Sequence, residues 1–244
     1  MAFLLRSRNK RGIAAAAGDV PAGALAYLDF LNGVYYAGSH QAVSNLLGGT
    51  FDISKIEARG LYISSVAAGQ HSPNAIGDLF TVLSDGLANG CTIITEFEPI
   101  DDNLAQSTAG LHVYYLDNAD PDLSTEFLSV ESAAGGGSGV IIADGAGFTF
   151  GPLADNFNTP LAQPQRCAAT IARDITTTRQ YAMSTNGSTA DTDTHDTAHD
   201  FTPVRIALWA LEEWSWWPDD WCVRTFTVYP AQEPAALPAL STIS

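Results

Sequence analysis

Short runs of β-branched and aromatic residues recur along the chain, separated by clusters of Gly, Asn, Asp and Pro. In several runs apolar and polar residues alternate, so that one face is largely apolar, as in TIITEFE (92–98) and CVRTFTVY (222–229). Alternation with a period of two is typical of half-buried strands. The pattern predicts strands over residues 24–30, 33–36, 56–65, 91–97, 110–116, 125–130, 139–143, 167–173, 179–185, 204–209 and 222–229.

The segments between these strands carry the signals of turns and loops. The pairs Asn32-Gly33, Asn186-Gly187 and Asp144-Gly145 favour hairpins, because these residues tolerate positive φ. Apolar residues three and four positions apart predict one short helix over 74–87. The strand pattern as a whole predicts an all-β fold of two antiparallel sheets, with at most one or two short helices. Longer polar stretches predict loops over 117–122, 133–139, 155–165 and 188–200.

The length and composition fit one sandwich domain with flanking segments. The chain has 244 residues, of which 46% are hydrophobic, enough for a sizeable core in a single domain. We expect an N-terminal arm over 1–20, the sandwich over 21–230 and a C-terminal tail over 231–244. Prolines at 230, 234 and 238 exclude a long continuous helix in that tail.

The charge distribution narrows the choice of partners. The net charge is −16, with 27 acidic against 11 basic residues. Such a surface repels nucleic acid and anionic membranes, so we expect neither as a partner. A basic cluster in the arm is predicted either to dock on an acidic neighbour or to be a disordered terminus. It consists of Arg6, Arg8, Lys10 and Arg11.

The cysteines give no sign of a metal or redox site. Cys91, Cys167 and Cys222 are far apart, and none lies in a CxxC pair or near a histidine at metal-binding spacing. We therefore expect buried free thiols in a protein that is assembled in a reducing cytoplasm.

The stretch TEFEPIDD (95–102) is the candidate for catalysis. Glu96 and Glu98 would share one strand face, and two carboxylates about 5–5.5 Å apart suit a retaining glycosidase. The spacing resembles the E-x-D-x-x-E pattern of some jelly-roll glycoside hydrolases, but Glu98 and Asp101 replace its last two acids and Pro99 interrupts the strand. Carboxylates on a solvated strand face are common in so acidic a chain. We therefore predict a protein that is not an enzyme.

The stretch DTDTHDTAHD (191–200) is the candidate for an ion site. Its four aspartates could supply oxygen ligands to calcium, although the order of an EF-hand loop is missing. The alternative is a solvated polar loop that binds nothing. We expect no cofactor other than this calcium ion, whose ligands would be Asp191, Asp193, Asp196 and Asp200.

The stretch WSWWPDDW (214–221) holds four of the five tryptophans. Each ring brings roughly 150–250 Å² of surface, so burying all of them in one core is difficult. Trp214, Trp216 and Trp217 are predicted to face a partner protein, to pack in the chain's own core, or to stack on a glycan.

Three segments together resemble one family of domains. They are LDFLNGVYYAGSHQAVSNLLGG (28–49), ATIARDITTTRQYAMSTNGSTADTD (169–193), and VRIAL (204–208) followed by 221–241. In this order they are similar to the concanavalin A-like, laminin-G-like jelly-roll domain of tailed-phage virion structural proteins. The resemblance implies a two-sheet jelly roll and a non-enzymatic structural or adhesive role.

From this resemblance we expect a virion protein, assembled in the host cytoplasm, that serves as a head decoration, a fibre or a tail-associated component. Its partners would be other virion proteins and copies of itself, often as a trimer, contacted through the basic arm and the tryptophan stretch. The alternative is a carbohydrate-binding adhesin that attaches to a glycan on the host surface. A jelly-roll glycosidase that uses Glu96 and Glu98 is a third hypothesis.

Overall fold

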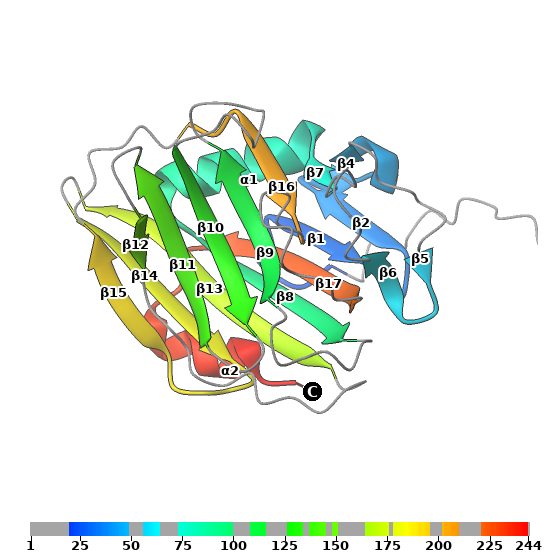
Figure 1. The fold of residues 1–244 in the computed structure, drawn as a ribbon. Helices are drawn as coiled ribbons and strands as arrows, with labels where there is room; N and C mark the ends of the chain where they lie inside the picture. Colours follow the sequence, from blue (N-terminus) through cyan, green and yellow to red (C-terminus); the bar gives the residue numbers. More distant parts are fainter. Residues whose placement is uncertain are drawn as a thin grey trace, which may run out of the picture.

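The computed structural model describes residues 20–48, 56–63, 73–99, 108–115, 126–133, 137–144, 148–150, 164–175, 178–195, 202–209 and 221–243. Its strands form two antiparallel sheets that face each other (Figure 1). The predicted all-β sandwich of jelly-roll type is thereby confirmed.

The larger sheet has ten strands. Eight of them run in the order β15-β14-β13-β8-β17-β1-β2-β3, and the β5–β6 hairpin joins through pairing of β6 with β17. The strands are β1 (Ala26–Asp29), β2 (Val34–Ala37), β3 (Ser39–His40), β5 (Ile56–Glu57), β6 (Gly60–Ile63), β8 (Cys91–Pro99), β13 (Gln165–Ile175), β14 (Thr178–Thr185), β15 (Asp191–His195) and β17 (Trp221–Pro230).

The smaller sheet has seven strands in the order β12-β11-β10-β9-β16-β7-β4. Its long hairpin of β10 and β11 has Ala133 opposite Gly137, so the loop predicted over 133–139 is shorter than expected. The strands are β4 (Leu47–Gly48), β7 (Asn74–Ala75), β9 (Thr108–Tyr115), β10 (Glu126–Ala133), β11 (Gly137–Asp144), β12 (Phe148–Phe150) and β16 (Arg205–Leu208).

The main core lies between the sheets. Trp209 is fully buried there, with its ring edge-on to Phe30 and Phe226 at centroid distances of 5.5 and 5.6 Å. Helix α1 (Gly77–Asn89) lies along one end of the sandwich and adds its leucines to this core (Figure 1). The helix predicted over 74–87 is present, but it begins at Gly77 and ends at Asn89, because Asn74 and Ala75 form β7. The buried free thiols are confirmed, since Cys91, Cys167 and Cys222 are all buried and unbridged.

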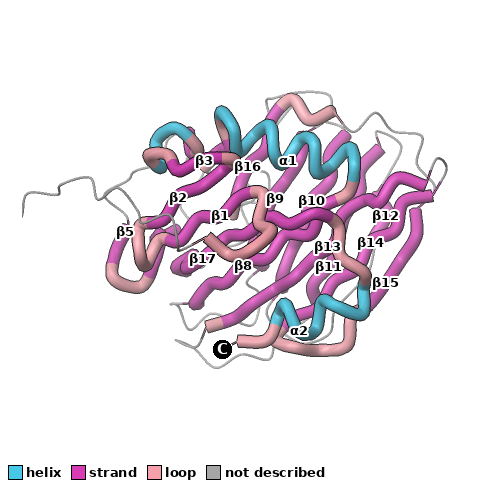
Figure 2. The backbone as a smooth tube through the Cα atoms, turned by 180° about the vertical axis from the view of Figure 1, so that it is seen from behind, coloured by secondary structure: helices cyan, strands magenta, loops and turns pink. Residues whose placement is uncertain are grey.

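A second, small core lies on the outer face of the larger sheet. A 3₁₀ turn (Pro234–Ala236) leads into α2 (Leu237–Ser241), which rests on this face (Figure 2). Leu237 packs against Ile94, Ala168 and Ala182 of the sheet. The prolines have broken the tail into two short turns, as expected. Among the described residues, no helix is long and apolar enough to span a membrane.

The pattern identified each of the longer strands but missed five short ones. Residues 56–65 contain β5 and β6 rather than one strand, and β3, β4, β7, β12 and β15 were not predicted. The loop predicted over 188–200 is wrong for Asp191–His195, which forms the edge strand β15. The tight turn at Asn186-Gly187, with φ of 49° and 78°, folds the chain back onto β14. Backbone pairing therefore makes a strand of a sequence that has no apolar face.

Candidate functional site

Helix α2 covers one part of the outer face of the larger sheet, and polar side chains occupy the part beyond it. Their placement follows from the alternation of the strands: Leu28, Phe226 and Cys167 point into the core, so their neighbours point outward. One outward row consists of Asp29, Thr225, Glu96 and Arg166 on β1, β17, β8 and β13. The next row consists of Tyr36, Tyr27, Thr227, Ile94 and Ala168.

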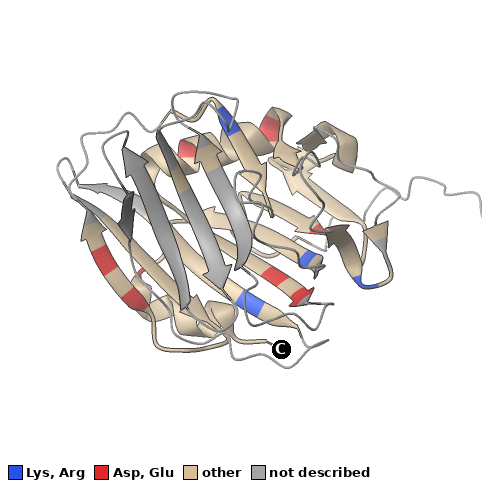
Figure 3. Cartoon of the chain, in the orientation of Figure 1, with Lys and Arg blue, Asp and Glu red and all other residues tan. Residues whose placement is uncertain are grey.

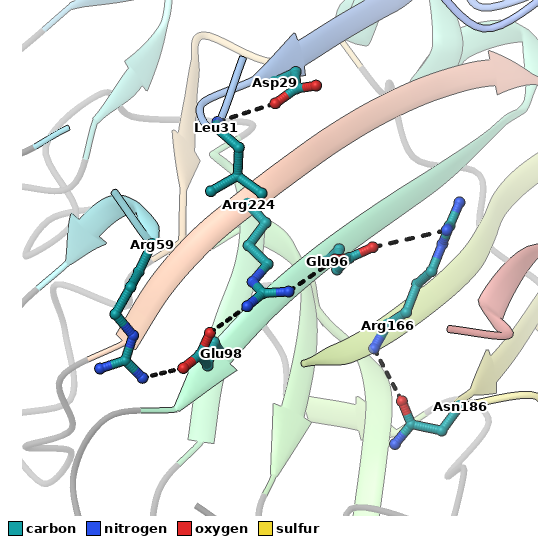
Figure 4. A network of polar contacts seen from close by, with 8 residues as sticks. All are labelled: Asp29, Leu31, Arg59, Glu96, Glu98, Arg166, Asn186 and Arg224. Carbon is teal, nitrogen blue, oxygen red and sulfur yellow. Dashed lines mark hydrogen bonds and ion pairs between the residues drawn. The ribbon is translucent and has the colours of Figure 1, made fainter. Parts of the chain in front are cut away.

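Glu98 is the most buried charge on this face, with 5% of its side chain exposed. The Arg59 guanidinium donates to its Oε1, and Arg224 Nη2 donates to its Oε2 at 2.5 Å. Both carboxylate oxygens are therefore engaged by guanidinium groups (Figure 4). Such charge-assisted hydrogen bonds offset the cost of removing a carboxylate from water.

Glu96 extends this chain of charges to a third arginine. Its Oε1 lies 3.6 Å from Arg224 Nη1, and its Oε2 lies 3.8 Å from Arg166 Nη1. Acidic and basic residues lie close together at this end of the sheet (Figure 3). The order is Arg59, Glu98, Arg224, Glu96, Arg166.

Two local irregularities bring the arginines to these carboxylates. The pairing of β17 with β8 shifts between Val223 and Thr225, so Arg224 is the extra residue of a β-bulge. On the other side, Gly60 has φ of +123°, and a Cβ there would lie 2.2 Å from the carbonyl oxygen of Val223. Only glycine permits this close approach, which places Arg59 beside Glu98.

Tyr27 and Asp29 border the charged row. Asp29 accepts hydrogen bonds from the Tyr27 hydroxyl at 3.0 Å and from the backbone N–H groups of Leu31 and Asn32 at 3.0 and 2.9 Å. The Asn32 side chain donates to it as well, at 2.8 Å. Burial raises the pKa of Tyr27, and the charge of Asp29 and the hydrogen bond to it raise that pKa further. Tyr27 therefore stays protonated, and remains a hydrogen-bond donor, across the physiological pH range. Asp29 stabilises the turn between β1 and β2.

Arg166 is held at its backbone, whereas its guanidinium has no hydrogen bond to the described residues. The Arg166 N–H donates to Asn186 Oδ1 at 2.9 Å, and Asn186 Nδ2 donates to Gln165 Oε1 at 2.5 Å. These bonds fix the start of β13 against the turn after β14 (Figure 4). The side chain is 26% exposed, and its Nε is buried without a hydrogen-bond partner.

The structure places Glu96 and Glu98 on one strand face, as the sequence predicted. Both oxygens of Glu98 accept hydrogen bonds from arginines. The oxygens of Glu96 lie 3.6 and 3.8 Å from guanidinium nitrogens, so each carboxylate is paired with arginines. The sequence did not identify the arginines as site residues. The one available signal was that arginines are scarce in this chain. With many acidic residues present, each arginine is expected to pair with a carboxylate.

The predicted calcium ligands are brought together only in part. Asp191 and Asp193 lie on exposed positions of β15, opposite Met183 and Tyr181. They are therefore strand residues and not part of a loop. Asp196 and Asp200 lie outside the described residues, within which no group of three or more His, Cys, Asp or Glu side chains is placed to hold a metal. Calcium binding stays a prediction.

Arg6, Arg8, Lys10 and Arg11 of the arm and Trp214, Trp216 and Trp217 lie outside the described residues. Strand β17 begins at Trp221, opposite Pro99 and two residues before the bulge region at Val223. Trp221, the last residue of the tryptophan stretch, therefore lies at the end of the sheet where Glu98 lies.

Comparison with known proteins finds no matching family model and no matching curated protein. Solved structures do share the fold. The CBM40 domain of the Ruminococcus gnavus IT-sialidase has a TM-score of 0.50 at 14% identity, covering 73% of this chain and 100% of that one. The leech intramolecular trans-sialidase has 0.51 at 14%, covering 75% and 27%. The botulinum neurotoxin serotype D binding domain has 0.51 at 8%, covering 90% and 50%. At such identities these likenesses concern the fold alone.

Proposed function

We propose that this chain is a carbohydrate-binding module that attaches to a glycan on a cell surface without hydrolysing it. The observation that carries the proposal is the outer face of the larger sheet beyond α2. There two tyrosines, Tyr27 and Tyr36, lie in register on adjacent strands beside the charged row of Glu96 and Arg166.

This combination of side chains suits a sugar. Aromatic rings present flat apolar surface to the C–H faces of a sugar ring, and charged groups form strong hydrogen bonds with its hydroxyls. Tyr36 is partly exposed and packs edge-on against His40, with ring centroids 5.5 Å apart. Four strand spacings separate β2 from β13, or roughly 19 Å, which is the scale of a short oligosaccharide.

The fold is consistent with this proposal. The CBM40 domain, with which this chain shares the sandwich, has been solved with α2,3-sialyllactose bound. That protein shows that such a sandwich can carry a sugar site. The proposed site on this chain rests on its own residues.

A glycan array on the intact chain, followed by calorimetric titration of the best hit, tests the proposal. We expect Tyr36→Ala to weaken binding about tenfold, equivalent to about 1.4 kcal/mol of lost stacking. Tyr36→Phe should retain binding because it keeps the ring. Val204→Ala removes exposed apolar surface directly before β16 of the other sheet and serves as the control. An array without hits, or a hit whose affinity ignores Tyr36→Ala, would overturn the proposal.

A phage virion component is a second candidate. The segments that resemble that family contain β2, β3, β14 and β17 and parts of β1, β13 and β15 in the larger sheet, and β4 and β16 in the smaller sheet, so they contribute strands to both sheets. Light scattering on the intact chain and on a variant lacking residues 1–12, in low and high salt, tests assembly. An oligomer that dissociates after the deletion or in high salt supports an N-terminal arm that docks on its neighbour. A monomer under all conditions excludes self-assembly.

A further inference from the structure

The tight turn between β14 and β15 carries a chemically reactive pair, Asn186-Gly187. In an Asn-Gly pair the backbone nitrogen of the glycine can attack the carboxamide carbon of the asparagine, because glycine has no side chain to block the approach. The attack requires that the asparagine side chain turns toward this nitrogen and that the glycine N–H leaves its hydrogen bond. The chain has three such pairs, the other two being Asn32-Gly33 and Asn89-Gly90.

In the folded chain the carboxamide of Asn186 and the N–H of Gly187 are both engaged. Asn186 Oδ1 accepts from the Arg166 N–H at 2.9 Å (Figure 4), and Asn186 Nδ2 donates to Gln165 Oε1 at 2.5 Å. The Gly187 N–H donates to Ser241 Oγ at 3.0 Å. The side chain is thereby held away from the nitrogen that would attack it, and that nitrogen is held by a residue far along the chain.

Ser241 is the last residue of α2, so the bond to Gly187 couples the turn to this helix. The side chain of Ser241 is fully buried, and its Oγ lies 2.8 Å from Ser184 Oγ. A Cβ on Gly187 would lie 2.9 Å from Thr242 Oγ1, so the end of α2 lies directly on the turn. Asn186 is partly exposed, so water can replace the bonds of its side chain. The Gly187 N–H, in contrast, is released only when α2 moves.

The docking of α2 depends on few contacts. The helix has five residues, of which Leu237 is the one fully buried leucine, and it packs on Ile94, Ala168 and Ala182 of the sheet. A short segment with so little buried apolar surface opens locally at a lower cost in free energy than the sandwich unfolds. The turn therefore becomes reactive in a local opening that leaves both sheets intact.

We propose that Asn186 is a site of self-modification whose reaction is controlled by the docking of α2. When α2 leaves the sheet, the Gly187 nitrogen gives its proton to water and bonds to Cγ of Asn186, and the Cγ–Nδ2 bond breaks to release ammonia. Water then opens the resulting succinimide ring at either carbonyl, which leaves aspartate or isoaspartate. The sum of the steps is the hydrolysis of one carboxamide by water, without electron transfer. The reaction needs no glycan and is independent of the proposed function.

The modification acts in one direction. In isoaspartate the backbone runs through Cγ and is longer by a methylene group, so Gly187 no longer meets Ser241. A carboxylate in place of the carboxamide also loses the NH₂ group that donates to Gln165 Oε1, and it places negative charge beside that oxygen. Both changes remove bonds that fix the turn against α2 and the start of β13. Once Asn186 has reacted, α2 therefore does not dock again.

The other two Asn-Gly pairs provide internal references in the same molecule. At Asn32-Gly33 the bonds come from the turn itself, where Asp29 Oδ2 accepts from Asn32 Nδ2 and the Asp29 carbonyl accepts from the Gly33 N–H, both at 2.8 Å. Asn89 is the last residue of α1, and its side chain donates to the carbonyl of Asp85 in that helix at 3.1 Å. These bonds are local, so the release of α2 should leave both pairs unchanged.

Peptide mapping of the intact chain by mass spectrometry, after incubation at mildly alkaline pH, tests this inference. We expect Ser241→Ala, which removes the acceptor of the Gly187 N–H, to raise the rate of deamidation at Asn186 about tenfold. Leu237→Ala, which weakens the docking of α2 but keeps the serine, should raise that rate by at least about tenfold. The rates at Asn32 and Asn89 should stay as they are in the parent chain, which also shows that both variants are folded.

Several results would overturn the control by α2. One is deamidation of Asn186 in the folded parent chain as fast as in the chain unfolded in urea; another is an unchanged rate in both variants. An equal increase at Asn32 and Asn89 would show that global unfolding is the route. Hydrogen exchange on the deamidated chain, purified by ion exchange, tests the one-way step. The amides of residues 237–241 should lose protection while those of α1 keep it, and full protection of both helices would refute that step.

Discussion

Glu98 shows how this chain keeps a carboxylate almost fully buried. Each of its oxygens faces a guanidinium, from the β5–β6 turn on one side and from the β17 bulge on the other. Exposed ion pairs contribute roughly 0–1 kcal/mol, whereas removing one partner of a buried pair costs about 3–5 kcal/mol. Arg59 is 43% exposed, so water screens its ion pair with Glu98. Arg224 is therefore the stronger partner of Glu98.

Replacing Glu98 by glutamine should lower the free energy of unfolding by about 2 kcal/mol, between these two limits. The amide oxygen can accept from one arginine, but the amide NH₂ then faces the other. Urea unfolding measures the loss. Glu96→Gln is the control, because its ion pairs of 3.6 and 3.8 Å are longer and its side chain is more exposed. Equal losses for the two variants would contradict the importance of the short pairs.

The β5–β6 hairpin and the β17 bulge are the elements that build the charged face. Strand β6 pairs with β17 over Leu61–Val223, Tyr62–Cys222 and Ile63–Trp221, directly before the bulge at Arg224. The hairpin can lie there because Gly60 has no side chain to clash with the Val223 carbonyl. One glycine thus decides where Arg59 lies.

Gly60→Ala should destabilise the chain by roughly 3 kcal/mol or more, since the added Cβ would lie 2.2 Å from a backbone oxygen at an unfavourable φ. Gly38→Ala is the matched control. Gly38 also has positive φ, +66°, but nothing lies within 4 Å of its Cβ position, so only the backbone strain of about 1 kcal/mol is expected. Urea unfolding of both variants measures the two losses of stability. If Gly60→Ala destabilises the chain no more than Gly38→Ala does, the close approach of Gly60 to the Val223 carbonyl is refuted.

At the scale of the whole molecule, the two sheets and α1 enclose a core that holds ionisable thiols away from water. Burial raises the pKa of Cys91 and of Cys167 to about 12, from an ordinary value of 9. Above pH 9 the unfolded chain loses these protons while the folded chain keeps them. The folded state is therefore stabilised fully below pH 9 and loses this contribution as the pH rises toward 12.

We expect the free energy of unfolding to fall between pH 9 and pH 12, by up to about 1.4 kcal/mol per pH unit for each thiol. Urea titrations at pH 8, 9, 10 and 11 give the slope. In Cys91→Ala the slope of the free energy of unfolding against pH should be smaller by the contribution of one thiol. This holds whatever the variant loses in overall stability. An unchanged slope would show that the Cys91 thiol is not protonated in the folded chain at these pH values.

The sequence by itself determined the fold class, the longer strands, the helix α1 and the buried thiols. Each follows from local physics. Alternating apolar residues must turn one face to a core, as in 92–98, and pairs such as Asn186-Gly187 have few backbone conformations to choose from. Strand β15 was missed because its pairing with β14 depends on the backbone alone, and the polar sequence DTDTH carries no sign of it.

The tertiary structure alone decided the charged face. Arg59, Arg166 and Arg224 lie far apart in the sequence, on a hairpin turn, a strand and a bulge, and each is an ordinary basic residue when considered singly. They converge on Glu96 and Glu98 because β13, β8 and β17 are neighbours in the sheet although they are not neighbours in the chain. Strand order, the register shift at the bulge and the close approach at Gly60 are long-range properties, and a pattern read along the chain contains none of them.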